Sequence, residues 1–249
     1  MRADGGWLLS GAKTWSSRAA FADRAFGLFR TDPAAGRHRG LTYLLFDLRA
    51  EGVTVRPIAQ LGGETGFAEI FLDEVFVPDA DVIGAAGDGW RIAMSTASHE
   101  RGLTLRSPGR FSAAAARLVE LWQRAGDTAG TALAGTALAG TGLADRVTDA
   151  WIGARAYQLH TLGTVMRLAE GAAMGAESSL GKVFWSELDV ALHETALDLL
   201  GPQAELRYGP APDGRWLGDY LFSLAGPIYA GTNEIQRTLI AERLLGLPR

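Results

Sequence analysis

The periodicity of apolar residues changes once along the sequence, near Val77-Pro78-Asp79, and this change constrains the fold more than any other feature. Before that point, short apolar segments rich in aromatics are separated by turn-forming residues such as Asp4-Gly5-Gly6. This pattern predicts an antiparallel sheet or a small barrel. The strands that it predicts cover residues 7–17, 24–30, 40–48, 53–57 and 67–77.

After residues 84–89, a loop of Gly, Ala and Asp, the sequence becomes helical in character. Because strands come first and helices follow, two segregated blocks are expected. We therefore predict an α+β fold: an antiparallel β-domain at residues 1–84, then a helical domain at residues 85–249. The predicted helices cover residues 90–105, 111–124, 146–171, 178–200 and 232–245.

A repeat interrupts the helical block. Residues 130–144 read GTALA-GTALA-GTGLA, and Gly and Thr both weaken a helix. We interpret this segment as an expanded connection between two helices, and a mobile lid is the alternative.

Composition and charge exclude several classes of function. The chain has no cysteine, which excludes disulfides, thiolate metal sites and cysteine nucleophiles. Its 4 histidines lack a metal-ligand spacing such as HxxxH, so no metal is expected. A net charge of −4 provides no basic field for nucleic acid or an anionic membrane. The apolar runs are too short to span a bilayer and no secretory pattern is visible, so we expect a cytoplasmic protein.

One carboxylate stands out in the predicted helix at residues 90–105. Ala93, Ala97 and Glu100 are spaced i, i+4 and i+7 and therefore share one face. Burial on that face would raise the pKa of Glu100 toward neutrality, as a general base requires. The alternative is a carboxylate at the helix edge, paired with Arg101, Arg106 or Arg110.

Two further motifs suit a ligand. Trp15-Ser16-Ser17 combines a ring that can stack on a flat cofactor with hydroxyls that can hydrogen-bond to it, and a half-buried core Trp is the alternative. Gly231 lets a ligand approach the backbone, and the N-terminus of the helix that follows attracts phosphate. Asn233 and Gln236 fit a variant capping box, so an ordinary helix cap is the alternative there.

Taken together, these motifs resemble one known family. The stretches LSGAKTWSS (9–17), EIFLDEVFVP (69–78), GDGW (87–90) and IYAGTNEIQR (228–237), with AERLLGLPR (241–249) at the end, are similar to the acyl-CoA dehydrogenases. The resemblance covers residues 6–126 and 146–249. It implies a partial antiparallel middle β-domain followed by a four-helix up-and-down bundle, and an FAD enzyme of acyl-CoA metabolism that oxidises an acyl-CoA thioester to the 2-enoyl-CoA. A carboxylate would remove the α-proton while the β-hydrogen leaves as hydride to flavin N5.

The resemblance also implies roles for individual residues. Trp15 would pack by the isoalloxazine ring and Ser17 would hydrogen-bond near its N5. The FAD phosphates or ribose would lie by Gly231, Thr232 and Glu234. The acyl-CoA pocket would include Arg101, with Ser98 and His99 near the pantetheine arm.

The position of the base separates two branches of the family. Many members carry Glu directly before the C-terminal Gly-Thr, where this chain has Ala230, which cannot take a proton. Another branch, with isovaleryl- and long-chain-type enzymes, carries the base on the first long bundle helix. Glu100, within Ser98-His99-Glu100-Arg101-Gly102, matches that second placement.

The chain also departs from the family pattern. The usual Arg-x-x-Phe-Gly is replaced by Arg110-Phe111-Ser112-Ala113, and the usual Gly-Gly-x-Gly by Leu200-Gly201-Pro202-Gln203-Ala204. The family's N-terminal helical domain and flavin-binding Gly/Ser loop are missing, so we expect an N-terminally truncated dehydrogenase that works with the missing part supplied elsewhere. The alternatives are a non-catalytic assembly subunit of a heteromeric dehydrogenase and a remnant without function.

The partners that the resemblance implies are an acyl-CoA substrate, and an electron-transfer flavoprotein or similar electron acceptor. A homo- or hetero-oligomer is expected as well, because the family's bundle packs against neighbours.

Overall fold

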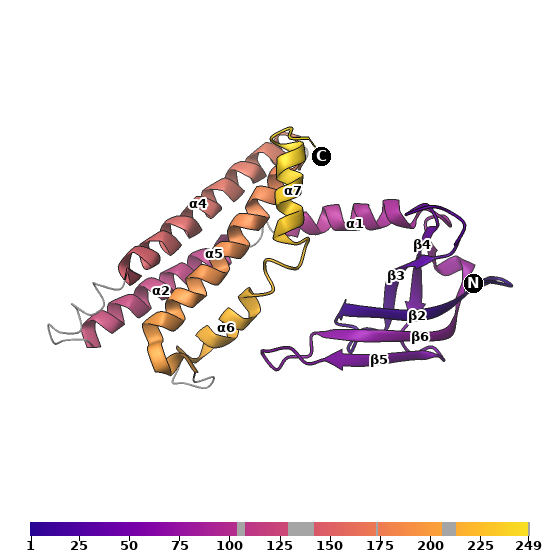
Figure 1. Cartoon of the computed structure of the whole chain (residues 1–249), viewed down its shortest axis with the longest axis horizontal. Helices are drawn as coiled ribbons and strands as arrows, with labels where there is room; N and C mark the ends of the chain where they lie inside the picture. The colour runs from indigo at the N-terminus through magenta and orange to yellow at the C-terminus, as the bar shows by residue number, and fades with distance from the viewer. Residues whose placement is uncertain (104–107, 129–141, 173, 206–212, 249) are drawn as a thin grey trace. The chain divides into compact units, whose positions relative to one another are not determined.

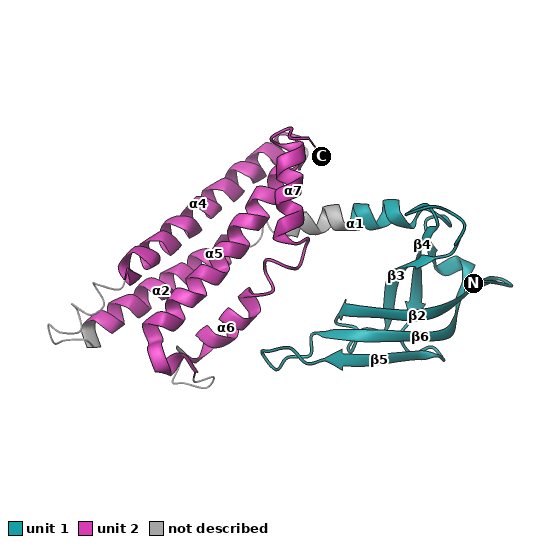
Figure 2. Ribbon diagram, in the orientation of Figure 1, with its two compact units in different colours: residues 1–99 teal, residues 100–249 magenta. Residues whose placement is uncertain are grey.

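The computed structural model describes residues 1–103, 108–128, 142–172, 174–205 and 213–248, and within these the side chains of residues 97–103, 127–128 and 213 also lie outside the description. The chain divides into two compact units, Met1–His99 and Glu100–Arg249 (Figure 2). This division falls inside helix α1 (Gly89–Leu103). The predicted domain boundary at residues 84–85 stays a prediction.

The first unit contains two antiparallel sheets, where the sequence predicted one sheet or a small barrel (Figure 1). The larger sheet has the order β1-β2-β6-β5 and the smaller one the order β3-β4-β7. All the predicted strands are present, and β1 and β7, of 2 residues each, were missed because so short a strand has no alternation to detect. The strands are β1 (Arg2–Ala3), β2 (Gly6–Ser17), β3 (Arg24–Arg30), β4 (Leu41–Asp47), β5 (Val53–Ile58), β6 (Phe67–Pro78) and β7 (Val82–Ile83).

Alternation along β6 shows why its sequence forms a half-buried strand. Ala68, Ile70 and Leu72 are buried, as their spacing predicts. Beyond them β6 shifts register against β2 and Glu74 adopts a left-handed φ of 50°, so that Val75 is the next buried residue. The buried side chains of both sheets form one hydrophobic cluster. The bulge therefore lets one strand keep its apolar side on the core along its whole length.

The second unit is helical. Its long helices α2, α4 and α5 pack on one another, and the shorter α6 and α7 each pack on α5 (Figure 1). Aromatic and aliphatic side chains such as Phe111, Leu118 and Trp185 fill its core. Strands followed by helices confirm the predicted α+β class. The helices are α2 (Pro108–Thr128), α4 (Leu143–Ala169), α5 (Glu177–Leu200), α6 (Trp216–Ser223) and α7 (Asn233–Arg243).

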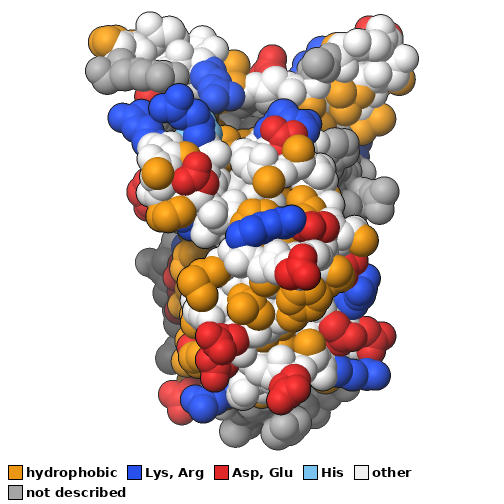
Figure 3. Space-filling view, turned by 90° about the vertical axis from the view of Figure 1, so that its right-hand side faces the viewer, with side chains coloured by type: hydrophobic (Ala, Val, Ile, Leu, Met, Phe, Trp, Pro, Cys, Tyr) orange, Lys and Arg blue, Asp and Glu red, His pale blue; other side chains and the backbone are white. Residues whose placement is uncertain are grey.

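Among the described helices, none combines the length and the apolar character that crossing a bilayer requires. On the face seen in Figure 3, Lys and Arg side chains lie among Asp and Glu side chains and hydrophobic ones. No group of three or more His, Cys, Asp or Glu that would hold a metal ion occurs in the described part of the chain.

Candidate functional site

Trp15 occupies a strained position near the end of β2. The register between β2 and β6 shifts between Lys13, paired with Ile70, and Ser16, paired with Ala68, so one extra residue is inserted in β2. Trp15 lies in this bulge with a φ of 57°. A left-handed backbone costs a non-glycine residue roughly 1 kcal/mol, and strain of this kind concentrates at functional sites.

The Trp15 side chain is unusually open for its size. Trp15 is 61% exposed, and its ring contacts Phe67 edge to face with the two ring centroids 5.9 Å apart. This excludes the alternative of a half-buried core Trp. Ser17, the last residue of β2, is also exposed and pairs with Phe67 across the ladder. The structure therefore brings the two predicted flavin contacts of this unit together at one strand end.

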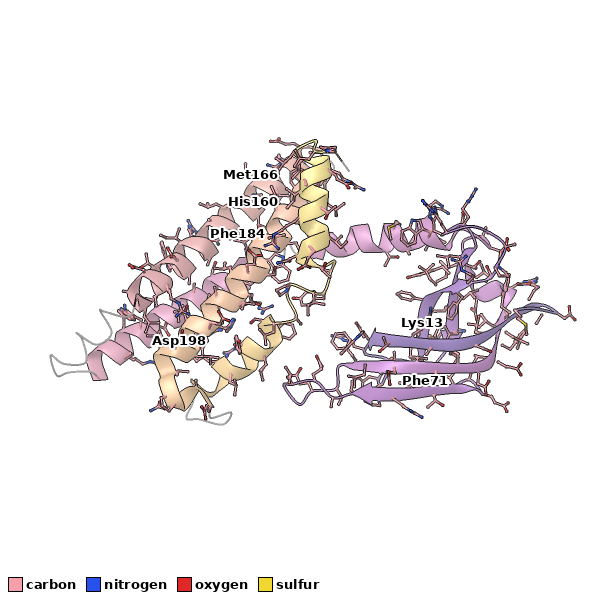
Figure 4. All side chains as sticks on the ribbon, in the orientation of Figure 1. Lys13, Phe71, His160, Met166, Phe184 and Asp198 are labelled. Atoms are coloured by element: carbon pink, nitrogen blue, oxygen red, sulfur yellow. The ribbon has the colours of Figure 1, made fainter. Side chains whose placement is uncertain are left out.

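Lys13, in the same motif, points toward β3 instead. Its ammonium donates a 2.5 Å hydrogen bond to Leu28 O and lies 4.5 Å from the centroid of the Phe29 ring. Burial lowers the pKa of Lys13. These contacts tie the two sheets together next to a cavity of about 240 Å³ that Lys13 helps to line. Figure 4 shows Lys13 on β2 and Phe71 on the neighbouring β6.

The turn before α7 holds the second group of predicted contacts. Ala230 and Gly231 are both left-handed, with φ of 54° and 85°. A Cβ on Gly231 would come within 2.4 Å of Gln236 Nε2, which is the end of a flexible side chain and can move, so this position favours glycine because of its φ. The Gln236 amide donates a hydrogen bond of 3.0 Å to Ala230 O.

Thr232, not Asn233, is the N-cap of α7. Its Oγ1 accepts a hydrogen bond of 3.4 Å from the Ile235 N–H. The capping box of Asn233 and Gln236 predicted from the sequence is wrong, because the Asn233 side chain turns into the bundle. There its Oδ1 accepts from Lys182 Nζ at 2.7 Å.

The charge of Glu234 follows from its place in the first turn of α7. Hydrogen bonds from its own backbone N–H and from the Thr232 hydroxyl, followed by the nearby charges of Arg237 and Lys182, hold the pKa of Glu234 below its usual range. Glu234 is therefore a carboxylate at neutral pH. Three predicted cofactor residues, Gly231, Thr232 and Glu234, lie on one turn and helix start.

Sequence reasoning missed the buried polar side chains that support this turn. Lys182 and Ser186, one turn apart on α5, both donate to Asn233 Oδ1, and Asn233 Nδ2 donates to Glu187 Oε1 at 3.2 Å. The signal in the sequence was the placement of Lys182 and Ser186 at i and i+4 in an otherwise apolar helix segment. Periodicity alone could not say that these side chains face inward.

The predicted base and substrate contacts belong to α1. Ser98, His99, Glu100 and Arg101 fall in α1, as predicted, but their side chains lie outside the described residues. Their roles stay predictions. Arg110, offered as an alternative partner of Glu100, forms an ion pair of 2.6 Å with Asp189 on α5. Most of the repeat at residues 130–144 also lies outside the described residues.

Two family models match successive parts of this chain. The family model described as acyl-CoA dehydrogenase, middle domain, matches residues 1–75. The model described as acyl-CoA dehydrogenase, C-terminal domain, matches residues 87–245. Together they leave little of the chain unmatched.

Curated relatives give the same result. Acyl-CoA dehydrogenase IpdE1 of Mycobacterium tuberculosis is 40% identical over 250 residues, which cover 98% of this chain and 60% of that protein. Acyl-CoA dehydrogenase FadE34 of the same organism is 36% identical over 254 residues, covering 100% of this chain and 32% of that protein. The chain thus spans 60% or less of the length of these two relatives.

Solved structures are similar as well. In the ChsE4-ChsE5 complex from Mycobacterium tuberculosis, one chain matches with a TM-score of 0.83 and 27% identity, covering 100% of this chain and 63% of that one. A glutaryl-coenzyme A dehydrogenase in complex with glutaryl-CoA matches with a TM-score of 0.77 and 25% identity, covering 98% and 60%.

Proposed function

Because the chain belongs to the acyl-CoA dehydrogenase family, a family of FAD-dependent oxidoreductases, we propose that it provides flavin and substrate contacts for the α,β-dehydrogenation of an acyl-CoA thioester. The observation that carries this proposal is the match of both family domains, at residues 1–75 and 87–245. FAD supplies the hydride acceptor when it is bound. The protein's own residues bind the flavin, orient the thioester and take the proton.

The described residues fit a flavin. The exposed Trp15 ring is proposed to lie against the isoalloxazine, with Ser17 near N5. The left-handed backbone of Trp15 leaves its indole exposed, and the flat apolar face of an indole can stack on a flavin. In the turn before α7, the helix N-terminus and the backbone of Gly231, which carries no side chain, suit an anion. A carboxylate would repel phosphate, so Glu234 is assigned to a ribose hydroxyl and Thr232 to the phosphates.

Glu100 is proposed as the base that takes the α-proton, since Ala230 offers no acceptor at the other position used in the family. Ser98, His99 and Arg101 are proposed to contact the acyl-CoA. Glu100→Gln keeps the shape and removes the base, so turnover of an FAD-loaded preparation should fall by about 10²–10⁴-fold. Glu194→Gln, an exposed carboxylate on α5, is the matched control. Turnover within about threefold of the parent in Glu100→Gln would remove Glu100 from the mechanism.

An assembly with a further protein chain is proposed from the surface of α4. This helix buries one face, formed by Leu143, Val147, Ala150, Ala154, Tyr157 and Thr161. A second face at helical spacing carries exposed apolar side chains: Trp151, Ile152, Leu159, Leu162 and Met166, each more than half exposed. We call these residues the outer face of α4. A helix that is apolar on two sides is normally covered on both.

An exposed aromatic side chain also lies on α5, beside the buried face of α4. Phe184 is 43% exposed and stacks on Tyr157, with ring centroids 6.3 Å apart. Figure 4 shows Met166, His160 and Phe184 near one end of these two helices. The occupant is proposed to be a homo- or hetero-oligomeric partner. An electron-transfer flavoprotein or a similar acceptor would take the electrons in a separate encounter.

The experiment that tests the function is the flavin absorption spectrum of the purified chain, alone and co-purified with the product of its neighbouring gene. A yellow protein that reduces its flavin when acyl-CoA is added supports the dehydrogenase. A colourless protein in both preparations would support the second candidate, a non-catalytic assembly subunit, which the outer face of α4 also suits.

A further inference from the structure

The smaller sheet of the β unit has one edge without a strand partner. In the part of the chain that the structure describes, β3 pairs with β4 and with no other strand. At the two ends of this ladder, Thr31 N donates to Gly40 O at 3.0 Å, and Leu48 N donates to Asp23 O at 2.9 Å. Because residues of an antiparallel ladder exchange hydrogen bonds at every second position, the odd-numbered residues of β3 face β4. The backbone N–H and C=O groups of the even-numbered residues therefore point to the open edge: Arg24, Phe26, Leu28 and Arg30.

The neighbouring edge of the larger sheet is open as well. β1 pairs with β2 at Gly6 and Trp7, and along residues 9–17 of β2 no described strand lies on that side. The cavity of about 240 Å³ is lined by residues 7–13 of β2 and by residues 28–31, most of which belong to β3. Two open strand edges thus border one cavity. We call this cavity with its two edges the β2–β3 slot.

The far edge of the larger sheet shows how an exposed edge is protected. β5 is the last strand there, and Asp73 N donates to Gly52 O at 2.9 Å where its ladder begins. The same alternation directs residues 53, 55 and 57 of β5 outward. Position 57 is a proline, which has no N–H to offer a further strand. The β3 edge contains no proline, so its backbone remains able to pair.

Lys13, labelled in Figure 4, places a positive charge in the slot. Its ammonium reaches from β2 to Leu28 O, one of the outward-facing carbonyls of β3. Burial lowers the pKa of Lys13, and no carboxylate of the described residues offsets that cost. A half-buried ammonium held by a neutral carbonyl is well suited to a carboxylate that a ligand brings in, since a charge-assisted hydrogen bond is the stronger one.

We propose that the β2–β3 slot receives one extended strand of another polypeptide chain, and that an aspartate or glutamate of this strand pairs with Lys13. The incoming strand adds to the open edge of β3, and one of its N–H groups replaces the ammonium at Leu28 O. Its carboxylate takes the ammonium that is released. A second copy of this chain does not fit, because antiparallel pairing of two β3 edges along their whole length puts Arg24 opposite Arg30. The proposal holds whether or not the protein binds flavin.

Hydrogen exchange tests the pairing of β3. The assembly purified from the organism's own cells is compared with the chain alone. The backbone amides of Phe26 and Leu28 should exchange at least about 10-fold more slowly in the assembly. The outward amide of Val55, on the β5 edge, is the internal control and should exchange equally in both. Equal rates at Phe26 and Leu28 in the two preparations, or a native protein without a second polypeptide, overturns the proposal.

A zero-length cross-link tests the partner of Lys13. The sequence has 2 lysines, Lys13 and Lys182, and Lys182 is 4% exposed. A carbodiimide joins an amine to a carboxylate that touches it. Mass spectrometry of the treated native assembly should therefore find Lys13 joined to an aspartate or glutamate of another polypeptide. A link from Lys13 to a second copy or to its own chain, or no link at all, contradicts the proposed strand.

Two substitutions separate a docking slot from a protected edge, since a lysine beside an open edge can also keep other strands away. Phe26→Pro removes one outward N–H of β3 and should weaken the complex, whereas Val55→Pro, the matched control on the β5 edge, should not. Lys13→Met should weaken the complex by about 10-fold or more and leave the isolated chain unchanged. If Phe26→Pro does not fold, Lys13→Met still decides. Parent-like affinity, or self-association of the isolated Lys13→Met chain, overturns the proposal.

Discussion

Lys182 Nζ donates a hydrogen bond of 2.7 Å to Asn233 Oδ1, which ties the middle of α5 to the first residue of α7. The two side chains are 4% and 3% exposed. Burial lowers the pKa of Lys182, so this ammonium depends on its acceptor. The N-terminus of α7, on which the proposed FAD contacts lie, is therefore supported from within the bundle.

Removing the acceptor should destabilise the helical unit. Asn233→Ala leaves Lys182 buried without a partner, and we expect a loss of about 2–3 kcal/mol in the free energy of unfolding. Thr238→Ala, an exposed position on the same helix, should change it by less than about 0.5 kcal/mol. Urea unfolding of both variants checks this. Equal midpoints for Asn233→Ala and the parent would mean that Lys182 finds another acceptor.

Trp15 is predicted to serve binding and not stability. In Trp15→Gly, relief of the left-handed strain gains about 1 kcal/mol, and loss of the contact with Phe67 costs about 0.5–1.5 kcal/mol. The stability should therefore change by less than about 1 kcal/mol, while FAD affinity falls by at least about 10-fold. Calorimetry and flavin titration measure the two effects. Unchanged FAD affinity would exclude Trp15 from the flavin site.

A substitution at Ala230 tests the position of the catalytic base. Its exposed side chain already has a Cβ at a φ of 54°, so Ala230→Glu adds little backbone strain and should fold normally. In a Glu100→Gln background, Ala230→Glu should restore part of the turnover. Recovery should be incomplete, since a misplacement of about 1 Å can cost on the order of 10²-fold.

With Glu100 retained, Ala230→Glu should instead harm the enzyme, because two carboxylates in one desolvated site cannot both ionise cheaply. Turnover of the single and double variants over about pH 6–9 is the measurement. The catalytic proposal fails if the double variant shows no rescue and the single Ala230→Glu variant is unaffected.

Acid should release the first strand of the β unit. A hydrogen bond from Arg2 holds the pKa of Asp79 below its usual range. A depressed carboxylate pKa contributes stability above its unfolded value of about 3.9, and that contribution is lost as the pH falls through the folded value. Asp79→Asn should thus be less stable than the parent at about pH 6, and the difference should shrink as the pH falls below about 4. Arg2→Met should behave in the same way at about pH 6, and a pH-independent difference would rule out the ion pair as the cause.

The outer face of α4 should mediate assembly. Placing charges there with Leu159→Glu and Met166→Glu should dissociate any oligomer, because an apolar interface does not accept unpaired carboxylates. Phe21→Glu, at a residue that is 75% exposed in the β unit, is the control. Sedimentation at micromolar concentration checks the prediction. A parent chain that is a stable monomer would contradict it.

The strands and long helices were predictable because their signals are local. The alternation of Ala68, Ile70 and Leu72 with polar neighbours defined β6, and the change of period near Val77 separated strands from helices. The motifs around Trp15 and Gly231 likewise identified the candidate cofactor residues. Helix α6, of 8 residues, was missed, since two turns of helix carry too little periodicity to detect.

What the sequence determined by itself is the order of elements, the family and the residue types available for chemistry, because periodicity and motifs are read from neighbouring positions. Only the tertiary structure decided that Thr232 is the cap while Asn233 turns inward, and that Asp189 meets Arg110 across 79 residues of chain. Which way a polar side chain turns depends on the partner that packing brings to it. That partner comes from a distant part of the chain, so the residues next to a polar side chain in the sequence do not predict it.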